Sequence, residues 1–258
     1  MAHSRLCSTS PTAPIQTTMQ LLYRGTFKVI HTLLRFGGLA APITRLSKIW
    51  LRHSQTMQIV RSARIDAVID GGAYVGEFAS LMRTALPDAD LVCVEPQTEC
   101  VALLKAKGYR VVHAALWKEN TRLTLSQPSD DGTSCTVVSG AASVKPTQQV
   151  DAVRLDSIPI TGNRLFVKLD LQGAEPEALE GMGALWERCA MVQLEADLAP
   201  GGNYPALRAL LAERNFVEYA IVNQLFVDNL VTEADVIWLR RDIWSDLWTG
   251  KAHTSGQP

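Results

Sequence analysis

The 258-residue chain is 47% hydrophobic and 20% charged, which is enough apolar material for one sizeable core plus an extension. Its longest apolar runs are interrupted by Arg, Lys or His well short of the ~20 residues that cross a bilayer, so no transmembrane helix is predicted. Five cysteines without a C-x-x-C pair argue against a disulfide framework and a thiolate zinc site, and favour a reduced, cytoplasmic protein.

Charge is distributed unevenly along the chain. Residues 1–65 hold nine Lys or Arg and no Asp or Glu, whereas the rest holds sixteen basic and twenty-six acidic side chains, a balance of −10. Nucleic-acid-binding proteins neutralise phosphates with a stripe of Lys and Arg. The acidic part of the chain therefore predicts no nucleic acid among its partners, and residues 1–65 are expected to behave differently from residues 66–258.

The N-terminal part divides into a tail and an extension. Residues 1–17 are rich in Ser, Thr and Pro without a hydrophobic period, which predicts a disordered tail. Residues 18–60 are expected to be a basic, amphipathic, helical extension, because basic and apolar residues in it recur at spacings of three and four.

Three interpretations of this extension are open. Its helices could pack on the adjacent domain and leave their charges in water. Residues 19–53, with Trp50 among the basic side chains, could instead contact an anionic membrane surface or an acidic partner, which would place the protein peripherally at a membrane. A segment without acids that contains Ser and Arg also resembles an organelle transit peptide.

The stretch 67–78, AVIDGGAYVGEF, predicts a ligand-binding turn. Its apolar start is typical of a buried parallel strand that ends near Asp70, and the apolar spacing after Gly76 is typical of a helix. Glycines between the two permit positive φ and let a ligand approach the backbone at the start of that helix. Ala73 stands where the G-x-G-x-x-G motif has its middle glycine, so a dinucleotide fits the pattern less well.

From residue 66 onward, strands and helices alternate. The patterns predict strands at 66–70, 89–95, 110–114, 165–169, 191–195, 216–222 and 235–240, with helices at 77–86, 98–107, after 174 and at 205–213. This βαβ succession predicts a parallel, doubly wound sheet. The domain is expected to cover residues 61–242, with a C-terminal tail at 243–258.

Residues 118–150 depart from this rhythm. Strands are expected at 121–125 and 150–155, and the segment between them, from 127 to 143, is rich in Ser, Thr, Gly and Asp. Such a segment is expected to fold over the ligand as a lid.

Acids are expected at the carboxyl ends of four strands, namely Asp70, Glu95, Asp170 and Glu195. In an open α/β sheet these ends line one crevice, where ligands bind. Glu95, which precedes Pro96, lies about twenty residues past the glycines, a position from which a carboxylate can bind both ribose hydroxyls of a nucleoside.

Together, the motifs DGGAYVGEF, VEPQ, HAAL, VRLD, VKLDLQGAEPEALEGM and VQLEAD resemble the FkbM-type methyltransferases, which depend on S-adenosylmethionine. The resemblance runs from about residue 66 to residue 240, and LDLQGAE followed by EALEG is its most specific part. It implies an α/β, Rossmann-like class I methyltransferase fold, with a seven-stranded, mostly parallel sheet whose last strand is antiparallel.

The resemblance also implies a cofactor site. The glycine turn would surround the methionine portion of S-adenosylmethionine, Glu95 would hold the ribose, and residues 114–116 would flank the adenine. The implied cofactor-binding residues are Asp70, Gly71, Gly72, Ala73, Tyr74, Gly76, Glu95, Pro96, Ala114, Ala115, Leu116, Asp170 and Gln172. Tyr74 stands where the family usually has Asn, and it could narrow the cofactor mouth or stack on the substrate.

The implied reaction is O-methylation of a hydroxyl on a small molecule or glycan. Asp170, together with Glu195, is the candidate base or orienting group, and the alternative is that Asp170 binds the cofactor amino group. His113 lies in or beside a strand, where histidines are more often packed or solvated than catalytic. No His/Cys cluster has metal-ligand spacing, so no metal is predicted, although Mg²⁺ on the carboxylates of Asp170 and Glu195 stays open.

Two other functions fit the same residues. One is a nucleotide-sugar or NAD-binding enzyme, which the missing middle glycine disfavours. The other is a scaffold or membrane-associated binding protein that keeps the fold without catalysing transfer.

Overall fold

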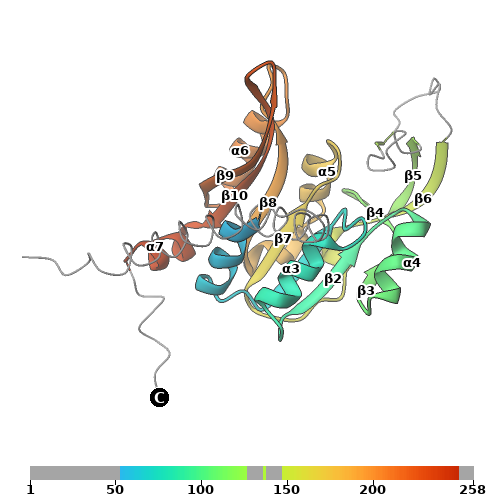
Figure 1. Cartoon of the computed structure of the whole chain (residues 1–258), viewed down its shortest axis with the longest axis horizontal. Helices are drawn as coiled ribbons and strands as arrows, with labels where there is room; N and C mark the ends of the chain where they lie inside the picture. The colour runs from blue at the N-terminus through green and yellow to red at the C-terminus, as the bar shows by residue number, and fades with distance from the viewer. Residues whose placement is uncertain (1–52, 127–135, 138–146, 250–258) are drawn as a thin grey trace, which may run out of the picture. The chain divides into compact units, whose positions relative to one another are not determined.

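The computed structural model describes residues 53–126, 136, 137 and 147–249 (Figure 1). The tail expected at 1–17 and nearly all of the basic extension lie outside these residues, as does the lid expected at 127–143 apart from Thr136 and Val137. The chain divides into two compact units, residues 1–51 and 52–258. All of the described strands and helices belong to the second unit.

Seven strands form the main sheet, in the order β3-β2-β1-β7-β8-β10-β9. Their bounds are β1 Ala67–Gly71, β2 Asp90–Val94, β3 Arg110–Val112, β7 Leu165–Leu169, β8 Cys189–Asp197, β9 Phe216–Val227 and β10 Leu230–Arg240. Neighbouring strands from β3 to β8 pair in parallel, and β10 pairs antiparallel with both β8 and β9. The predicted fold class, a mostly parallel sheet with an antiparallel last strand, is confirmed.

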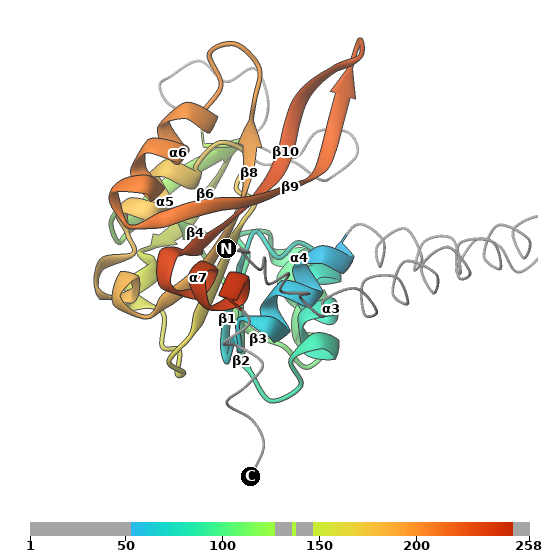
Figure 2. The ribbon, with the colours of Figure 1, turned by 90° about the vertical axis from the view of Figure 1, so that its left-hand side faces the viewer.

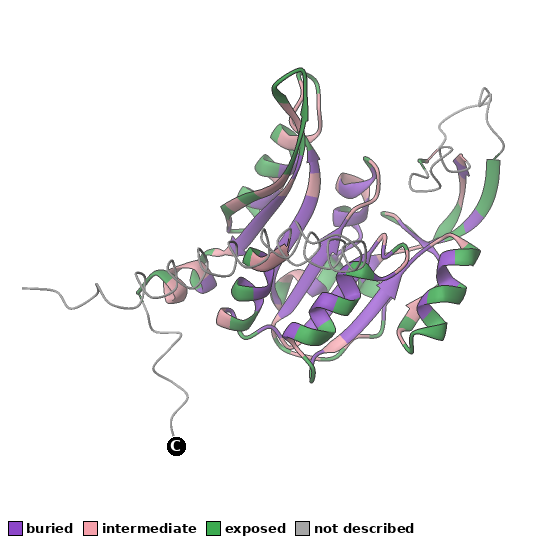
Figure 3. Cartoon of the chain, viewed as in Figure 1, coloured by how far each residue is buried: buried purple, intermediate pink, exposed green. Residues whose placement is uncertain are grey.

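The two central strands explain why the sequence shows continuous apolar runs. Every residue of β1 and of β7 is buried, because helices cover both faces of the sheet. Two charged residues interrupt these runs, Asp70 on β1 and Lys168 on β7, and they are register partners across the strand pair. A carboxylate and an ammonium therefore lie on neighbouring strands in the buried centre of the sheet, which Figure 3 colours purple.

Helices lie on both faces of the sheet (Figure 2). A helix at 53–62, α3 (Glu77–Ala85) and α4 (Thr98–Ala106) cover one face, and α5 (Glu175–Glu180) and α6 (Tyr204–Glu213) cover the other. Short 3-10 helices, η1 (Leu155–Ser157) and η2 (Gly183–Glu187), connect the strands. In the described part of the chain, no helix is both long and apolar enough to cross a membrane.

Both ends of the described chain add helices to the domain. The Thr56 hydroxyl, in the helix at 53–62, donates to the side-chain oxygen of Gln193 on β8 at 3.0 Å. The last residues of the expected basic extension thus pack on the sheet. α7 (Arg241–Thr249) occupies the start of the expected C-terminal tail. The domain limits themselves stay a prediction.

A second, three-stranded sheet has the order β4-β6-β5. It consists of β4 (Ala115–Leu116), β5 (Thr121–Ser126) and β6 (Thr147–Val153), and it encloses a small core of its own with Leu125 and Val150. The strands that the sequence predicts at 121–125 and 150–155 therefore exist but belong to this separate sheet. It places Leu116 and Leu125 beside the carboxyl end of the main sheet.

The last two strands extend past the main sheet as a hairpin (Figure 1). β9 and β10 are twelve and eleven residues long, longer than the segments 216–222 and 235–240 that the apolar pattern predicts. Asp228 and Asn229 form its two-residue turn with φ of 51° and 65°, as the preferred type I′ hairpin turn requires.

Candidate functional site

The glycine turn joins the ends of three strands. Gly72 has φ of 70°, and a Cβ there would overlap the backbone oxygen of Asp170, so only glycine fits. The Gly72 N–H donates to the Val94 oxygen at 3.0 Å, and the Asp170 N–H donates to the Gly71 oxygen at 3.1 Å. The turn therefore holds the carboxyl ends of β1, β2 and β7 together, where ligands of open α/β sheets bind.

A cavity of about 620 Å³ opens at these strand ends. Of the residues expected from the sequence, the structure brings together Gly72, Ala73, Tyr74, Glu95, Pro96, Ala114, Ala115, Leu116, Asp170, Gln172 and Glu195 in its lining. Three others are not in the lining, namely Asp70, Gly71 and Gly76. Three of the four strand-end acids thus share one crevice, as expected, but Asp70 is fully buried beside it.

The two glycines outside the lining serve packing. A Cβ on Gly71 would lie 2.6 Å from a methyl carbon of Leu116, and one on Gly76 would lie 2.7 Å from a methyl carbon of Leu104. Gly76 also has φ of 82° at the start of α3. These glycines therefore permit close contacts within the protein, which the sequence pattern cannot distinguish from contacts with a ligand.

Glu95 is a fixed carboxylate in one half of the cavity. It is buried, its Oε2 accepts the N–H of Tyr74 at 2.8 Å, and its Oε1 accepts the N–H of Gln97 at 2.9 Å. Burial raises the pKa of Glu95, and the two N–H donors oppose that rise. Each carboxylate oxygen keeps a second lone pair, so the group can accept two further hydrogen bonds from a diol.

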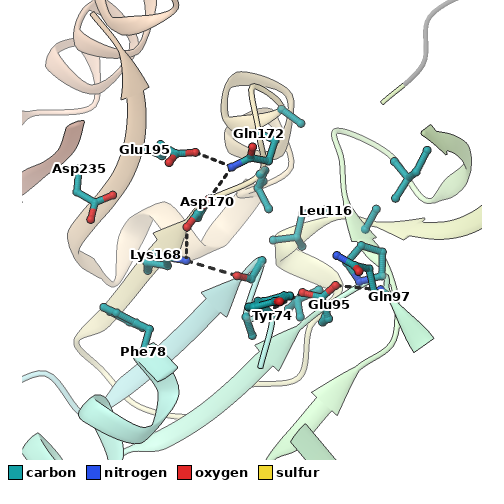
Figure 4. A pocket seen from close by; sticks show the side chains of 18 of the residues that line it. Tyr74, Phe78, Glu95, Gln97, Leu116, Lys168, Asp170, Gln172, Glu195 and Asp235 are labelled. Atoms are coloured by element: carbon teal, nitrogen blue, oxygen red, sulfur yellow. Dashed lines mark hydrogen bonds and ion pairs between the residues drawn. The ribbon is translucent and has the colours of Figure 1, made fainter. Parts of the chain in front are cut away.

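Tyr74 adopts a backbone conformation that is rare for a bulky residue, with φ of 48°. Its side chain lines the cavity and is 37% exposed. In Figure 4 the ring lies beside Glu95. The prediction that it narrows the mouth or stacks on a ligand stays a prediction.

An apolar slot completes this half. Leu116 comes from β4, Leu125 from β5, and Val137 makes an isolated bridge to Leu125. His113 lies outside the lining, and its Nε2 contacts the backbone oxygen of Pro96 at 3.1 Å. His113 therefore contacts the turn after β2 and is not part of the cavity lining.

Lys168 organises the other half of the cavity. Its Nζ lies 3.2 Å from Asp170 Oδ2 and 3.7 Å from Asp70 Oδ1, and 5.6 Å from the centroid of the Phe78 ring. Burial would lower the pKa of Lys168, but the two carboxylates raise it above the ordinary value, so the ammonium stays charged.

Asp170 and Asp70 respond differently to this cation. Burial acts to raise the pKa of Asp170, but Lys168 outweighs it and holds the pKa below the ordinary value. Asp70 is fully buried, and there burial wins and raises its pKa despite Lys168. Asp170 is therefore the ionised carboxylate that faces the cavity.

Gln172 links Asp170 to Glu195. Its Nε2 donates to Asp170 Oδ1 at 3.2 Å and to Glu195 Oε2 at 2.8 Å (Figure 4). Burial and the nearby Asp170 charge both raise the pKa of Glu195, because two adjacent carboxyl groups do not ionise together. The pKa values of the two acids that the sequence assigns to catalysis thus shift in opposite directions, that of Asp170 down and that of Glu195 up.

The loop that carries Gln172 is held by Glu175. Glu175 Oε1 accepts the N–H of Leu171 at 2.7 Å and that of Gly173 at 3.4 Å, and the Asn203 amide donates to its Oε2 at 3.4 Å. Gln172 has φ of 56°, a conformation that persists where the surroundings determine it. Burial raises the pKa of Glu175 to about 7.

Several cavity residues are not singled out by the sequence patterns, namely Phe78, Lys168, Leu225, Glu233 and Asp235. A lysine inside an otherwise apolar central strand, as in LFVKL, is a signal that could have identified Lys168. Phe78 has the spacing of an ordinary core position in an amphipathic helix. The other three lie on the hairpin, about sixty residues from Asp170 in sequence, and no local pattern places them at this site.

No group of three or more His, Cys, Asp or Glu that could hold a metal ion occurs in 53–126, 136–137 or 147–249. The Gln172 amide joins Asp170 and Glu195.

Comparison with known proteins gives one family and a set of distant structures. Residues 70–218 match the family described as "Methyltransferase FkbM domain". No curated protein matches the sequence.

Similar solved structures include an FkbM methyltransferase from Methylobacillus flagellatus KT, with a TM-score of 0.47 and 15% identity over 67% of this chain and 43% of that one. A precorrin-6y C5,15-methyltransferase from Geobacter metallireducens GS-15 has a TM-score of 0.40 and 14% identity over 70% and 84%. Magnesium protoporphyrin IX methyltransferase from Synechocystis PCC 6803, solved with S-adenosylmethionine, has a TM-score of 0.44 and 10% identity over 90% and 100%. This chain thus spans less than half the length of the first of these proteins.

Proposed function

The chain belongs to the FkbM methyltransferase family, and on this basis we propose that it transfers a methyl group from S-adenosylmethionine to a hydroxyl of a small molecule or glycan. The observation that carries the proposal is the position of the Asp170 carboxylate, which lines the cavity and is held there by Lys168 and Gln172; the contact with Lys168 also lowers its pKa. It lies in the same cavity as Glu95, which has the chemistry to bind a ribose.

The residues of the Glu95 half fit the cofactor. The buried carboxylate of Glu95 has its two oxygens oriented by backbone N–H groups, which leaves acceptors for the two ribose hydroxyls. Leu116 and Leu125 offer apolar surface for a purine ring. When bound, S-adenosylmethionine supplies an electrophilic methyl group on a sulfonium.

Asp170 is the group that receives the proton of the acceptor hydroxyl. A base needs to be ionised before the reaction, and Lys168 ensures this by keeping the pKa of Asp170 low. Its Oδ1 is fixed by Gln172 and its Oδ2 by Lys168, so the carboxylate can orient a hydroxyl without rotating. This orientation is the main contribution that a protein makes to a displacement between preformed reactants.

Glu195 acts as the neutral neighbour of that base. Its raised pKa favours the protonated form, in which it adds no second negative charge beside Asp170 and can donate a hydrogen bond to an acceptor oxygen. The pair therefore combines a proton acceptor and a hydrogen-bond donor on one wall of the cavity.

If Asp170 instead binds the amino group of the cofactor, D170N should bind S-adenosylhomocysteine more weakly than the wild type does. Titration calorimetry with S-adenosylhomocysteine and with NAD tests the proposal. The nucleoside thioether is expected to bind to the wild type and to D170N with similar affinity, and NAD is expected not to bind. Tight NAD binding, or no binding of the thioether, would contradict the proposed function.

Transfer itself is tested with methyl-labelled S-adenosylmethionine and a cell extract, followed by identification of the labelled product. A methyl ether is the expected product. A methylated nitrogen or carbon would limit the proposal to methyl transfer in general, and the absence of any labelled product would favour a scaffold that has lost transfer.

A further inference from the structure

The β9–β10 hairpin continues one wall of the cavity. Leu225, Glu233 and Asp235 line the cavity, and Leu225 lies opposite Glu233 in the antiparallel pair. Alternate residues of a strand point to the same face, so Val227 and its cross-strand partner Leu230 share the face of Leu225. These three residues, Leu225, Val227 and Leu230, form an apolar strip.

The apolar strip is exposed to an unusual degree for aliphatic side chains. Leu225 and Val227 are each 50% exposed and Leu230 is 69% exposed, and the projecting end of the hairpin is exposed in Figure 3. Covering such a surface is favourable in proportion to the apolar area removed from water. Because Leu225 belongs both to the strip and to the cavity, a molecule bound in the cavity can cover the strip without a gap.

The charges between the strip and Asp170 restrict what that molecule can be. Glu233 and Asp235 both line the cavity, Glu233 opposite Leu225 of the strip and Asp235 opposite Glu195, the neighbour of Asp170. Lys168 is the one Lys or Arg among the described residues that line the cavity, and both of its carboxylate partners lie within 4 Å. Among the described lining residues, a phosphate, sulfate or carboxylate on the acceptor would therefore meet Glu233 and Asp235, with no Lys or Arg other than the already paired Lys168.

We propose that the acceptor is an amphipathic molecule, with an uncharged, hydroxyl-bearing head that reaches Asp170 and an apolar chain or ring that lies along the apolar strip. The inference rests on the proposed function, because it takes the cavity to be the acceptor site.

The dimensions of the strip favour a small molecule over a protein partner. From Leu225 to the Val227–Leu230 pair the strip extends about 7 Å along the strands, two residues at the rise of a β-strand. Three side chains offer far less than the about 800 Å² per partner that stable protein interfaces bury. A short alkyl chain or a single ring matches this length.

The test compares methyl β-glucoside with octyl β-glucoside, below its micellar concentration, as probes for the full-length protein saturated with S-adenosylhomocysteine. Each buried methylene strengthens binding up to about fourfold, so the octyl compound is expected to bind at least tenfold more tightly by calorimetry. Octyl sulfate, which has the same chain and an anionic head, is expected to bind more weakly than octyl glucoside.

Two variants test whether the octyl group binds along the apolar strip. V227T/L230T removes apolar surface from the strip and leaves every cavity-lining side chain in place, and threonine keeps the β propensity. F226T is the matched control, because Phe226 is 59% exposed on the same hairpin but adjacent to Leu225 and therefore on the opposite face. V227T/L230T is expected to reduce the preference for octyl over methyl glucoside to threefold or less, and F226T is expected to retain it.

Three results would overturn the inference: equal binding of the two glucosides, no binding of either, or an unchanged octyl preference in V227T/L230T. A wild-type dimer that dissociates in both V227T/L230T and F226T would also overturn it, because the hairpin would then bind a second copy of the chain. Affinity for S-adenosylhomocysteine, measured in the same samples, reports on the proposed function separately, since none of these substitutions lies in the cofactor half.

Discussion

The two halves of the cavity are held by different means. In the half around Glu95, which we propose binds the cofactor, backbone N–H groups fix the Glu95 carboxylate, and the walls come from the turns after β1 and β2 and from strands β4 and β5 of the small sheet. In the acceptor half, Lys168, Asp170, Gln172 and Glu195 hold one another through side-chain contacts across β7 and β8. The first half is a local construction, whereas the second is a network in which one side chain sets the charge of the next.

Substitution of Asp170, the proposed base, is expected to have the largest effect on activity. D170N should lower kcat about 10²- to 10⁴-fold, the usual contribution of a general base. Affinity for S-adenosylhomocysteine should change less than threefold, because the cofactor half is independent. E195Q, which copies the protonated form of Glu195, should keep kcat within tenfold. A D170N enzyme with full turnover would refute the base assignment.

Removing the cation should damage the fold and the charge of the base together. K168M leaves Asp70 and Asp170 without their counterion, and breaking a buried ion pair on one side costs about 3–5 kcal/mol in the free energy of unfolding. The pKa of Asp170 should rise, so the acid limb of the kcat–pH profile should move to higher pH. K168R keeps the charge and should shift that limb less. Denaturant unfolding and a pH series measure both effects.

Glu175 provides a test through the pH dependence of stability. Its pKa is about 7 in the folded protein, against an ordinary value of 4.5. A raised pKa means that the folded state binds the proton more tightly than the unfolded state does. Protonated Glu175 therefore adds up to about 3 kcal/mol to the free energy of unfolding, a contribution that is fully present below pH 4.5 and is lost as the pH rises through 7. E175Q should show a smaller loss of stability between pH 4.5 and 7 than the wild type. Parallel curves for the two proteins would contradict the assignment.

Substitution of Glu95 tests the cofactor half and is expected to have a smaller effect than D170N. E95Q should weaken binding of S-adenosylhomocysteine about 10- to 150-fold, because hydrogen bonds to a charged group contribute about 1.5–3 kcal/mol. At saturating cofactor its kcat should stay close to that of the wild type, which separates it from D170N. Q97A is the matched control, since only the backbone N–H of Gln97 contacts Glu95. Equal losses in E95Q and Q97A would indicate a general disturbance of the turn.

The contrast between local contacts and a network of side chains also explains how much of the molecule can be predicted from sequence. Strand β7 and the placement of Glu95 are predictable from apolar runs, glycines and spacing, because these features depend on neighbours in the chain. Asp70 looks equivalent to Asp170 in sequence, yet its position inside β1 buries it against Lys168 while Asp170, one residue past β7, reaches the cavity.

The hairpin illustrates what sequence patterns leave out. The register of β9 against β10 places Leu225 opposite Glu233, and only the assembled sheet brings both to the cavity. The added length of the two strands depends on pairing with each other, since neither segment shows the alternation of a half-buried strand. The pKa of Glu195 is equally non-local, because burial and the charge of Asp170, which follows a different strand, both raise it.

The most direct test of the proposed site is a crystal structure with S-adenosylhomocysteine. The account predicts that the ribose hydroxyls bind the Glu95 carboxylate, and that Asp170 keeps its contacts with Lys168 and Gln172 while one side of its carboxylate faces the open cavity next to the sulfur. A ribose bound away from Glu95, or an Asp170 carboxylate occupied by the amino group of the ligand, would contradict it.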